Sequence, residues 1–238
     1  MHAFHEVLKS FFSPQSFRAS LPDVWAGFQV NLKMMVVAEL LVLALALGIA
    51  IVRGLPGRGA APFRGLAIVY TDVFRGTPLI LVAFLVGFGL PGLQLHGIST
   101  RSNFFYGVTA LTLVYTAYVT EVYRAGIESV HGSQRMAARS LGLSYFQALR
   151  YVVIPQAVRR VIPPLLNDFI GLQKDTALVT VIGVTEVAAQ AQDFSNKQYN
   201  FTAYVVAAVF FIFLTIPLAR FTDHLIAQRE ARERAQAI

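Results

Sequence analysis

Long apolar runs constrain the fold of this chain more than any other feature of its sequence. A bilayer core of roughly 30 Å needs about 20 apolar residues in each spanning helix, and the run MMVVAELLVLALALGIAIV at 34–52 is interrupted only by Glu39. Five stretches meet or approach this requirement: 34–52, 77–90 (extended backwards by LAIVYTDVF), 104–120, the less uniform 161–188, and 203–219. The sequence therefore predicts an all-α integral membrane protein with five transmembrane helices.

The composition agrees with this class. Of the 238 residues, 55% are hydrophobic and 14% are charged, whereas soluble domains carry about 25% charged residues. The absence of cysteine excludes disulfides and thiolate metal sites. The five histidines are scattered over termini and loops, so we expect no metal site.

The net charge of +7 is distributed unevenly along the chain. Arginines gather in the loop after residue 52, in the long segment 124–160 and at the C-terminus, whereas the alternating loops carry little beyond Arg101 and Lys197. Arginine and lysine accumulate on the cytoplasmic side of membrane proteins. The pattern therefore predicts an external N-terminus, with the long segment and the C-terminus in the cytoplasm. The distribution of the arginines indicates a chain embedded in a lipid bilayer, and it argues against binding to nucleic acid.

The first 24 residues do not form a signal peptide, because their charges are scattered and they contain no compact apolar core. Phe4, Val7, Leu8 and Phe11 recur at helical spacing, which suggests a helix lying along the membrane surface. A frayed terminus is the alternative. We expect three parts: a surface or elbow segment at 1–24, a transmembrane domain at 25–222 and a cytoplasmic tail at 223–238.

The long segment between the third and fourth apolar runs has local signals for two helices. Residues 133–141 (SQRMAARSL) are good helix formers, and Gly142 follows where a left-handed cap favours glycine. Ser144, with Gln147 three residues later, matches a capping box that starts a second helix. Pro155 is expected to end or kink that helix. The prediction is a helix, a tight turn and a helix.

Two interpretations of this segment follow from the residues alone. In one, it is an amphipathic hairpin on lipid headgroups, whose arginines serve only topology. In the other, it docks a soluble partner, and the small residues Ala137 and Ala138 let another surface approach closely. The length of the segment and its two capped helices favour docking, because a topological signal needs neither.

The same residues resemble a known family motif. Ala137-Ala138, three residues, Gly142, nine residues and then Val152-x-Ile154-Pro155 match the spacing of the EAA loop of ABC importer permeases, with Met136 where the family has glutamate. The resemblance implies that the loop inserts into a groove on a separate ATPase subunit. The residues that it assigns to ATPase coupling are Arg135, Met136, Ala137, Ala138, Leu141, Gly142, Leu143, Ser144 and Pro155.

The resemblance extends in order from about residue 70 to about 185. It includes FRGTP at 74–78, Glu121 and the segment 124–130, PQA at 155–157, and Lys174-Asp175-Thr176. These motifs resemble the polar amino-acid branch of the permeases. They imply a type I importer permease in a prokaryotic inner membrane, translocating a polar amino acid or derivative. The implied partners are two ATPases that carry the ATP and Mg²⁺, a second permease copy or paralogue, and an extracytoplasmic substrate-binding protein.

Charged residues inside the apolar runs are candidates for a substrate path, because an ionisable group at membrane depth usually faces a protein interior or a water-filled route. Glu39 either lines such a route or bonds to a neighbouring helix. For Asp72 and Arg75, one helical turn apart, a local ion pair is the favoured interpretation. Glu121 and Arg124 are expected to form a surface pair. Gly76 and Pro78 are expected to break or bend the second span.

The triplet Lys174-Asp175-Thr176 lies deep in the fourth run, with Asn167 on the same helical face as Lys174. Polar breaks near the midplane often mark substrate sites in transporters, and interhelical pairing is the alternative. Residues 183–192 suggest a short outward-facing helix, either a docking lip or an ordinary loop helix. The path candidates are Glu39, Arg75, Thr77, Asn167, Lys174, Asp175 and Thr176.

Catalytic motifs are absent from the sequence. It has no phosphate-binding Gly-x-x-x-x-Gly-Lys-Ser/Thr loop, so the chain itself is expected to bind no nucleotide or other cofactor, and it has no constellation typical of an enzyme. Any chemical energy that the chain uses is then expected to come from another subunit. A self-sufficient ion-coupled transporter or channel is the alternative function, but the five spans show no internal repeat.

Overall fold

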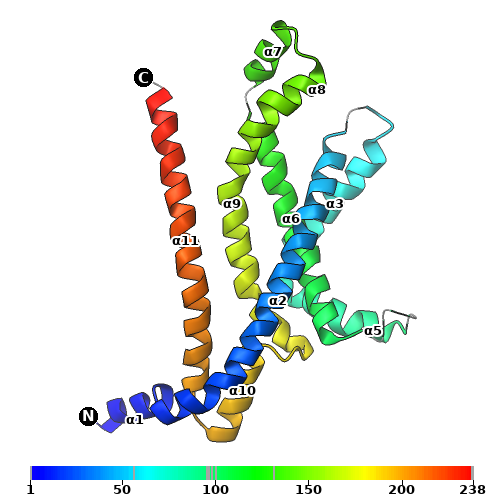
Figure 1. Ribbon diagram of the computed structural model, residues 1–238. Helices are drawn as coiled ribbons and strands as arrows, with labels where there is room; N and C mark the ends of the chain where they lie inside the picture. Colours follow the sequence, from blue (N-terminus) through cyan, green and yellow to red (C-terminus); the bar gives the residue numbers. More distant parts are fainter. Residues whose placement is uncertain are drawn as a thin grey trace. The chain divides into compact units, whose positions relative to one another are not determined.

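The computed structural model describes residues 2–236 apart from Pro56, Leu95, His96, Ile98, Thr100 and His131 (Figure 1). Within these residues the regular structure is entirely helical. The elements in chain order are α1 (His2–Phe11), α2 (Pro14–Arg53), α3 (Ala61–Gly76), α4 (Leu79–Phe84), the π-helix η1 (Leu85–Gly89), α5 (Leu90–Gly92), α6 (Asn103–Glu128), α7 (Gly132–Ser140), α8 (Tyr145–Ala148), the π-helix η2 (Leu149–Val153), α9 (Ile154–Asp175), the 3₁₀ helix η3 (Thr176–Ile182), α10 (Val187–Gln198) and α11 (Thr202–Gln236).

The chain divides into two compact units, each built from three separate segments. Unit 1 comprises Met1–Leu40, Pro78–Thr112 and Ile170–Arg220. Unit 2 comprises Leu41–Thr77, Leu113–Phe169 and Phe221–Ile238. The hairpin predicted after residue 130 belongs to unit 2.

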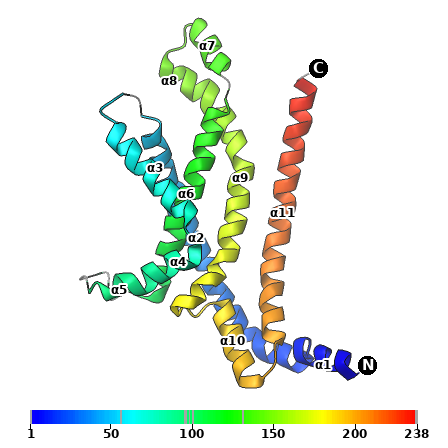
Figure 2. The same ribbon diagram turned by 180° about the vertical axis from the view of Figure 1, so that it is seen from behind.

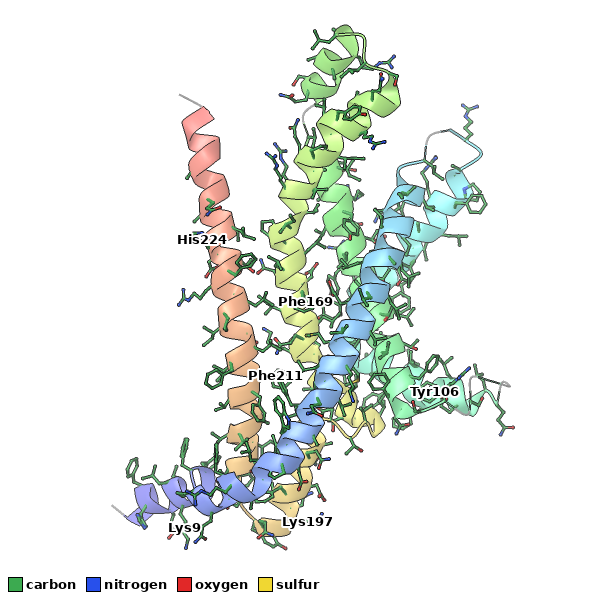
Figure 3. All side chains as sticks on the ribbon, in the orientation of Figure 1. Lys9, Tyr106, Phe169, Lys197, Phe211 and His224 are labelled. Atoms are coloured by element: carbon green, nitrogen blue, oxygen red, sulfur yellow. The ribbon has the colours of Figure 1, made fainter. Side chains whose placement is uncertain are left out.

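The core of unit 1 joins α2, α10 and the start of α11. Its aromatic centre is Phe28 of α2, which stacks on Phe210 at 5.2 Å and meets Phe211 edge-on at 5.6 Å between ring centroids (Figure 3). In the view from behind, α10 lies beside the first turns of α11 (Figure 2). The buried members of this cluster are Val24, Phe28, Val187, Ala191, Ala203, Val206 and Ala207.

Helix α1 is attached to the loop between α10 and α11. The Phe201 backbone N–H donates to the Ser10 carbonyl at 2.8 Å, and the Asn200 side chain donates to the Lys9 carbonyl at 3.0 Å. The rings of Phe11 and Phe201 stack at 5.2 Å. Lys9 and Lys197 lie at the same end of unit 1 (Figure 3). These contacts attach α1 to the rest of unit 1, and its place along the membrane surface stays a prediction.

Length and composition identify two helices that can cross a membrane, Phe4–Arg53 and Thr202–Gln228, among the described residues. Helices Ala61–Gly76 and Leu79–Gly92 qualify only as a broken pair. Between them, Thr77 is extended (φ −104°, ψ 127°), as expected for a residue that precedes proline. This confirms the break predicted at Gly76 and Pro78.

The apolar run 161–188 is not one helix. Helix α9 begins earlier, at Ile154, and its α-helical hydrogen bonding ends at Asp175. The 3₁₀ helix η3 follows and ends at Gly183, whose φ of +80° is left-handed. The helix predicted at 183–192 is also displaced: α10 begins at Val187, with Glu186 as its N-cap, and continues to Gln198. The run therefore changes direction where the polar triplet interrupts it.

Candidate functional site

Figure 1 shows α7 and α8 joined as a hairpin in unit 2. Its turn has the two features that the sequence predicts. Gly142 adopts φ +86°. The Leu143 N–H donates to the Ala138 carbonyl at 3.2 Å, and the Gly142 N–H donates to the Arg139 carbonyl at 3.0 Å. This pair of bonds is the Schellman arrangement that closes a helix C-terminus. A side chain at position 142 would be strained whatever space surrounds it.

The second helix of the hairpin starts with the predicted capping box. The Gln147 N–H donates to Ser144 Oγ at 3.3 Å, and the Ser144 N–H donates to Gln147 Oε1 at 2.8 Å. The helix does not end at Pro155, because α8 passes through the π-helix η2 into α9 without a gap. Of the two predicted effects of Pro155, an end or a kink, the structure excludes the end.

The hairpin is held by small buried side chains and leaves one face of α7 free. Ala138 and Ala148 are buried, and α7 contacts both α8 and η2. Ala138 is therefore buried within the chain, although the sequence suggested it for a partner surface. On the free side of α7, Met136 is 67% exposed, and Leu141, in the turn after α7, is 85% exposed. The side chain of Arg135 lies outside the described part of the structure.

Glu121 of α6 is the centre of an ionic cluster in unit 2. It accepts hydrogen bonds from Arg53 at the end of α2 and from Arg124, the latter at 2.8 and 3.0 Å. Arg53 also donates to Thr71 Oγ1 of α3 at 3.1 Å, and Arg124 pairs with Glu128. The Glu121 side chain is only 16% exposed. The predicted Glu121–Arg124 pair is confirmed, but it belongs to a half-buried network, not to a solvated surface.

Arg75 is not paired as the sequence suggested. Among the described side chains, no ion pair joins Asp72 to Arg75, although they are one helical turn apart. Arg75 lies 4.0 Å from Glu121 instead, and its guanidinium is 6.0 Å from the centre of the Tyr118 ring. The Arg75 side chain is 44% exposed. Its long ion pair leaves a cation available to a ligand.

A cavity of about 380 Å³ lies beside this cluster, between α3, α6 and α9 of unit 2. Arg160, Pro164 and Asp168 line it from one face of α9, because they are spaced four residues apart. Within the described part of the chain, Oδ2 of Asp168 is buried and has no hydrogen-bond partner. The full lining is Arg75, Tyr118, Glu121, Val122, Ala125, Gly126, Ser129, Arg160, Pro164 and Asp168.

This cavity has the chemistry of a site for a small zwitterion. Two guanidinium groups line it, and Arg160 also donates to the Ser129 carbonyl. The unpartnered carboxylate oxygen of Asp168 suits an ammonium group, while Arg75 suits a carboxylate. Sequence reasoning selected only Arg75 from this set. The signal that it missed was the shared face of Arg160, Pro164 and Asp168.

The other path candidates are placed differently. In unit 2, Asn167 is exposed and Thr77 donates to the Val73 carbonyl of its own helix at 2.8 Å, so neither lines the cavity. In unit 1, Lys174 is exposed, and Glu39 and Asp175 are half-buried. Thr176 is fully buried and accepts a hydrogen bond from Asn31 at 3.0 Å. This bond joins two helices, as the interpretation of the triplet as an interhelical contact predicts for Thr176.

Asn31 and Glu186 form a second polar centre, in unit 1, that sequence reasoning did not find. Glu186 is fully buried and accepts hydrogen bonds from Asn31 at 2.9 Å and from the N–H groups of Ala188 and Ala189. The Asn31 side-chain oxygen accepts from the Val187 N–H at 3.0 Å. A Cβ at Gly27 would lie 2.8 Å from the backbone of Glu186 and Val187. Helix α2 therefore packs directly on the start of α10.

Two smaller features complete the site survey. A polar cavity of about 290 Å³ in unit 1 is lined by residues of η3, α10 and the turn between them, including Thr180, Thr185, Gln192 and Asp193. Among the described residues, no group of three or more His, Asp or Glu side chains is placed to hold a metal ion. His96 and His131 lie outside the described residues.

Comparison with solved structures defines the class of protein. The chain resembles a chain of "Crystal structure of an amino acid ABC transporter with histidines" with a TM-score of 0.81 and 32% identity, covering 90% of this chain and 97% of that one. It also resembles a chain of the MetNI methionine ABC transporter in inward-facing conformations, with a TM-score of 0.71 over 91% of this chain. At 16% identity the second likeness shows the fold alone. The fold is that of a type I ABC importer permease.

Comparison with protein families and relatives is consistent with this class. The model for the binding-protein-dependent transport system inner membrane component matches residues 57–230. The arginine transport system permease protein ArtQ of Bacillus subtilis (strain 168) is 33% identical over 88% of this chain and 93% of its own length. The probable glutamine ABC transporter permease protein GlnM of the same organism is 38% identical over 69% of this chain and 74% of its own length. The chain belongs to this family and is the membrane permease component of an ABC importer.

Proposed function

We propose that the chain translocates a polar amino acid or a derivative of one. Relatives over most of its length are named for arginine, glutamine and glutamate transport. These compounds share an α-ammonium and an α-carboxylate, and the cavity at Arg75 and Asp168 offers one group of opposite charge for each. That pairing is the single observation that carries the substrate assignment. In this proposal the unpaired Asp168 oxygen receives the ammonium and Arg75 receives the carboxylate.

We further propose that the α7–α8 hairpin is the docking site for a separate ATPase subunit. Its support is the closed turn at Gly142, the capping box at Ser144, and the exposed Met136 and Leu141, on and just after a helix that also carries arginines. The ATPase binds and hydrolyses ATP with Mg²⁺, and the hairpin carries its motion into α6 and α9, which flank it. The residues proposed for coupling are Arg135, Met136, Ala137, Ala138, Leu141, Gly142, Leu143, Ser144 and Pro155.

The proposed topology has five spans: α2, the broken pair α3–α4 with η1 and α5, α6, α9 with η3, and α11. It places the N-terminus, α1 and α10 outside and the hairpin and C-terminus in the cytoplasm of a prokaryotic cell. The arginine distribution supports it. A second permease copy or paralogue completes the pathway. The polar cavity at η3 and α10 is the proposed contact surface for the extracytoplasmic binding protein. Glu39, Thr77, Asn167, Lys174, Asp175 and Thr176 remain path candidates.

Replacing Gly142 tests the coupling proposal. Gly142→Leu puts a branched side chain at φ +86°, which costs about 1–2 kcal/mol locally and opens the turn. The variant is expected to keep its fold in the membrane but to lose ATP-dependent uptake in proteoliposomes that contain the ATPase and the binding protein. Uptake and ATP hydrolysis are measured together, because uncoupling lowers uptake more than hydrolysis.

The matched control is Gly132→Leu at the start of α7 in the same hairpin, where an added Cβ would meet open space. It is expected to transport normally. Normal uptake by Gly142→Leu would contradict the proposed coupling role of the hairpin. Uptake by the wild-type chain that survives removal of ATP would contradict the importer assignment and favour ion coupling.

A further inference from the structure

The free face of α7 carries the apolar Met136, at the position where the permease motif that the hairpin resembles has glutamate. Met136 is 67% exposed and lies two residues, about 200° of helix, from the buried Ala138. Its side chain therefore projects away from the rest of the hairpin. Leu141, in the turn after the same helix, is 85% exposed.

Lipid contact does not explain these exposed side chains. The remaining residues of α7 are small or polar, including Ser133, Gln134, Arg139 and Ser140. A helix that lies in the acyl region needs a continuous apolar face, and α7 has isolated apolar residues among polar ones. Single apolar side chains are common on protein surfaces, so the charge around Met136 has to indicate what covers it.

The charges around Met136 and Leu141 indicate which charges a partner protein must carry at the edge of its contact surface. Residues 129–160 contain five arginines and neither aspartate nor glutamate. Arg139 and Arg150 are exposed in the structure. A surface of one sign is complemented by a surface of the opposite sign. The partner therefore presents acidic side chains around an apolar seat.

We propose that Met136 selects the ATPase subunit with which this chain assembles, by requiring an apolar seat in the docking groove. The inference rests on the proposed function, since it assumes that an ATPase docks on the hairpin. A groove that receives glutamate must supply a cation or hydrogen-bond donors, because a buried carboxylate without them is strongly unfavourable. A groove that receives methionine must be apolar, and it leaves donors unpaired if it is not. The residue at 136 thus separates two classes of ATPase partner.

Three substitutions at this position separate the effects of shape, polarity and charge. Met136→Leu keeps the seat apolar, Met136→Gln adds a neutral amide, and Met136→Glu adds a charge with nearly the same shape as glutamine. None removes a buried contact, and glutamate at 136 lies three residues before Arg139, a spacing that stabilises a helix. The hairpin is therefore expected to fold in every variant.

The measured quantity is the affinity of the permease, reconstituted in nanodiscs of neutral lipid, for the ATPase subunit that co-purifies with the wild-type chain. We expect Met136→Leu to bind within about twofold of wild type. Met136→Gln is expected to bind about tenfold more weakly, and Met136→Glu more weakly again. Added salt is expected to weaken binding in all four proteins, because the arginines contribute in each.

The order of affinities decides the result. Tighter binding by Met136→Glu than by wild type would show a cationic seat and overturn the proposal, and so would equal binding by all four proteins. A wild-type chain that binds no ATPase would instead contradict the proposed function, so the two failures are distinguishable.

A thiol probe tests lipid as the alternative occupant. The chain has no cysteine, so Met136→Cys carries a single thiol, whose reaction with a water-soluble maleimide reports its exposure. We expect the reaction of this thiol with the maleimide to slow only when the ATPase is added, in neutral and in anionic nanodiscs. A control thiol at the exposed Gln198, in α10, is expected to react at the same rate with and without the ATPase. Protection of position 136 by anionic lipid alone would overturn the proposal.

Discussion

Asp168 shows how a single residue can identify a binding site. A buried carboxylate oxygen with no hydrogen-bond partner is unfavourable by about 1–3 kcal/mol or more, and here it faces a cavity with two arginines. In the proposed function, a bound ammonium group removes that penalty, so Asp168 favours the substrate-bound form.

Replacing Asp168 by asparagine is expected to weaken substrate recognition without damaging the fold. The side chains have the same shape, but only aspartate carries the charge that an ammonium group needs. We expect the substrate concentration for half-maximal stimulation of ATP hydrolysis to rise about tenfold, equivalent to about 1.4 kcal/mol. Basal hydrolysis and ATPase binding are expected to stay unchanged.

Asp72→Asn serves as the matched control, because it makes the same substitution at a residue that is exposed and does not line the cavity. It is expected to leave the half-maximal concentration unchanged. An unchanged value in Asp168→Asn would contradict the assignment of the ammonium group to Asp168.

At the residue scale, the sequence predicted hydrogen bonds between near neighbours in the chain, but not bonds between residues far apart in it. Gly142 and the Ser144–Gln147 box were predicted because their hydrogen bonds close within a few residues. Asn31 and Glu186 lie 155 positions apart, and no local pattern joins them. Arg75 illustrates the same limit, since a local partner was expected and the nearer acid comes from α6.

At the scale of elements, the close approach of α6 and α9 depends on a missing side chain. A Cβ at Gly126 would lie 2.0 Å from Cγ1 of Val161. Since both helices also line the cavity and continue into the hairpin, their separation controls the site and the proposed coupling together. Small residues at such crossings let helices in membranes pack closely.

We expect Gly126→Ala to destabilise the protein by about 1–3 kcal/mol, because the added methyl group forces α6 and α9 apart. Thermal unfolding in a fixed detergent measures the effect. The double variant Gly126→Ala/Val161→Ala is expected to recover part of the loss, since it removes the clashing group.

Gly132→Ala is the control for helix propensity, because an added Cβ there meets nothing within 4 Å. It is expected to unfold at or above the wild-type temperature. If the second substitution in the Gly126→Ala background restored nothing, steric contact with Val161 would not be the cause.

Apolar runs located the helices but not their ends. Helix α2 begins at Pro14, 20 residues before the run that predicted it at 34, because packing of Val24 and Phe28 on α10 and α11 extends it. The sequence could not predict that a 3₁₀ helix, η3, would follow α9 at Thr176. The sequence indicated a polar interruption, whereas the 3₁₀ geometry depends on the buried bonds of Thr176 and Asn31.

At the scale of the whole molecule, the proposed topology makes a prediction that the cysteine-free sequence is suited to test. We expect a thiol introduced at Gln198 to react with a membrane-impermeant reagent from outside intact cells. A thiol introduced at Ser133, in the hairpin, is expected to react only after the membrane is opened. Both positions are exposed in the structure, so burial does not account for a difference.

Reaction of both thiols from the same side would contradict the topology, because it requires an even number of crossings between residues 133 and 198. The proposed arrangement has one crossing there, through α9 and η3. The same measurement therefore tests the fourth of the five spans, which apolarity alone indicated least clearly.

The closed turn of the hairpin has a consequence for the order of assembly. The bonds made by Gly142, Leu143, Ser144 and Gln147 close the end of α7 and the start of α8. In the proposed function, the hairpin is therefore already folded before an ATPase binds to it. A permease made in excess would await its ATPase as a finished membrane protein, and one that loses its ATPase would remain ready to bind another.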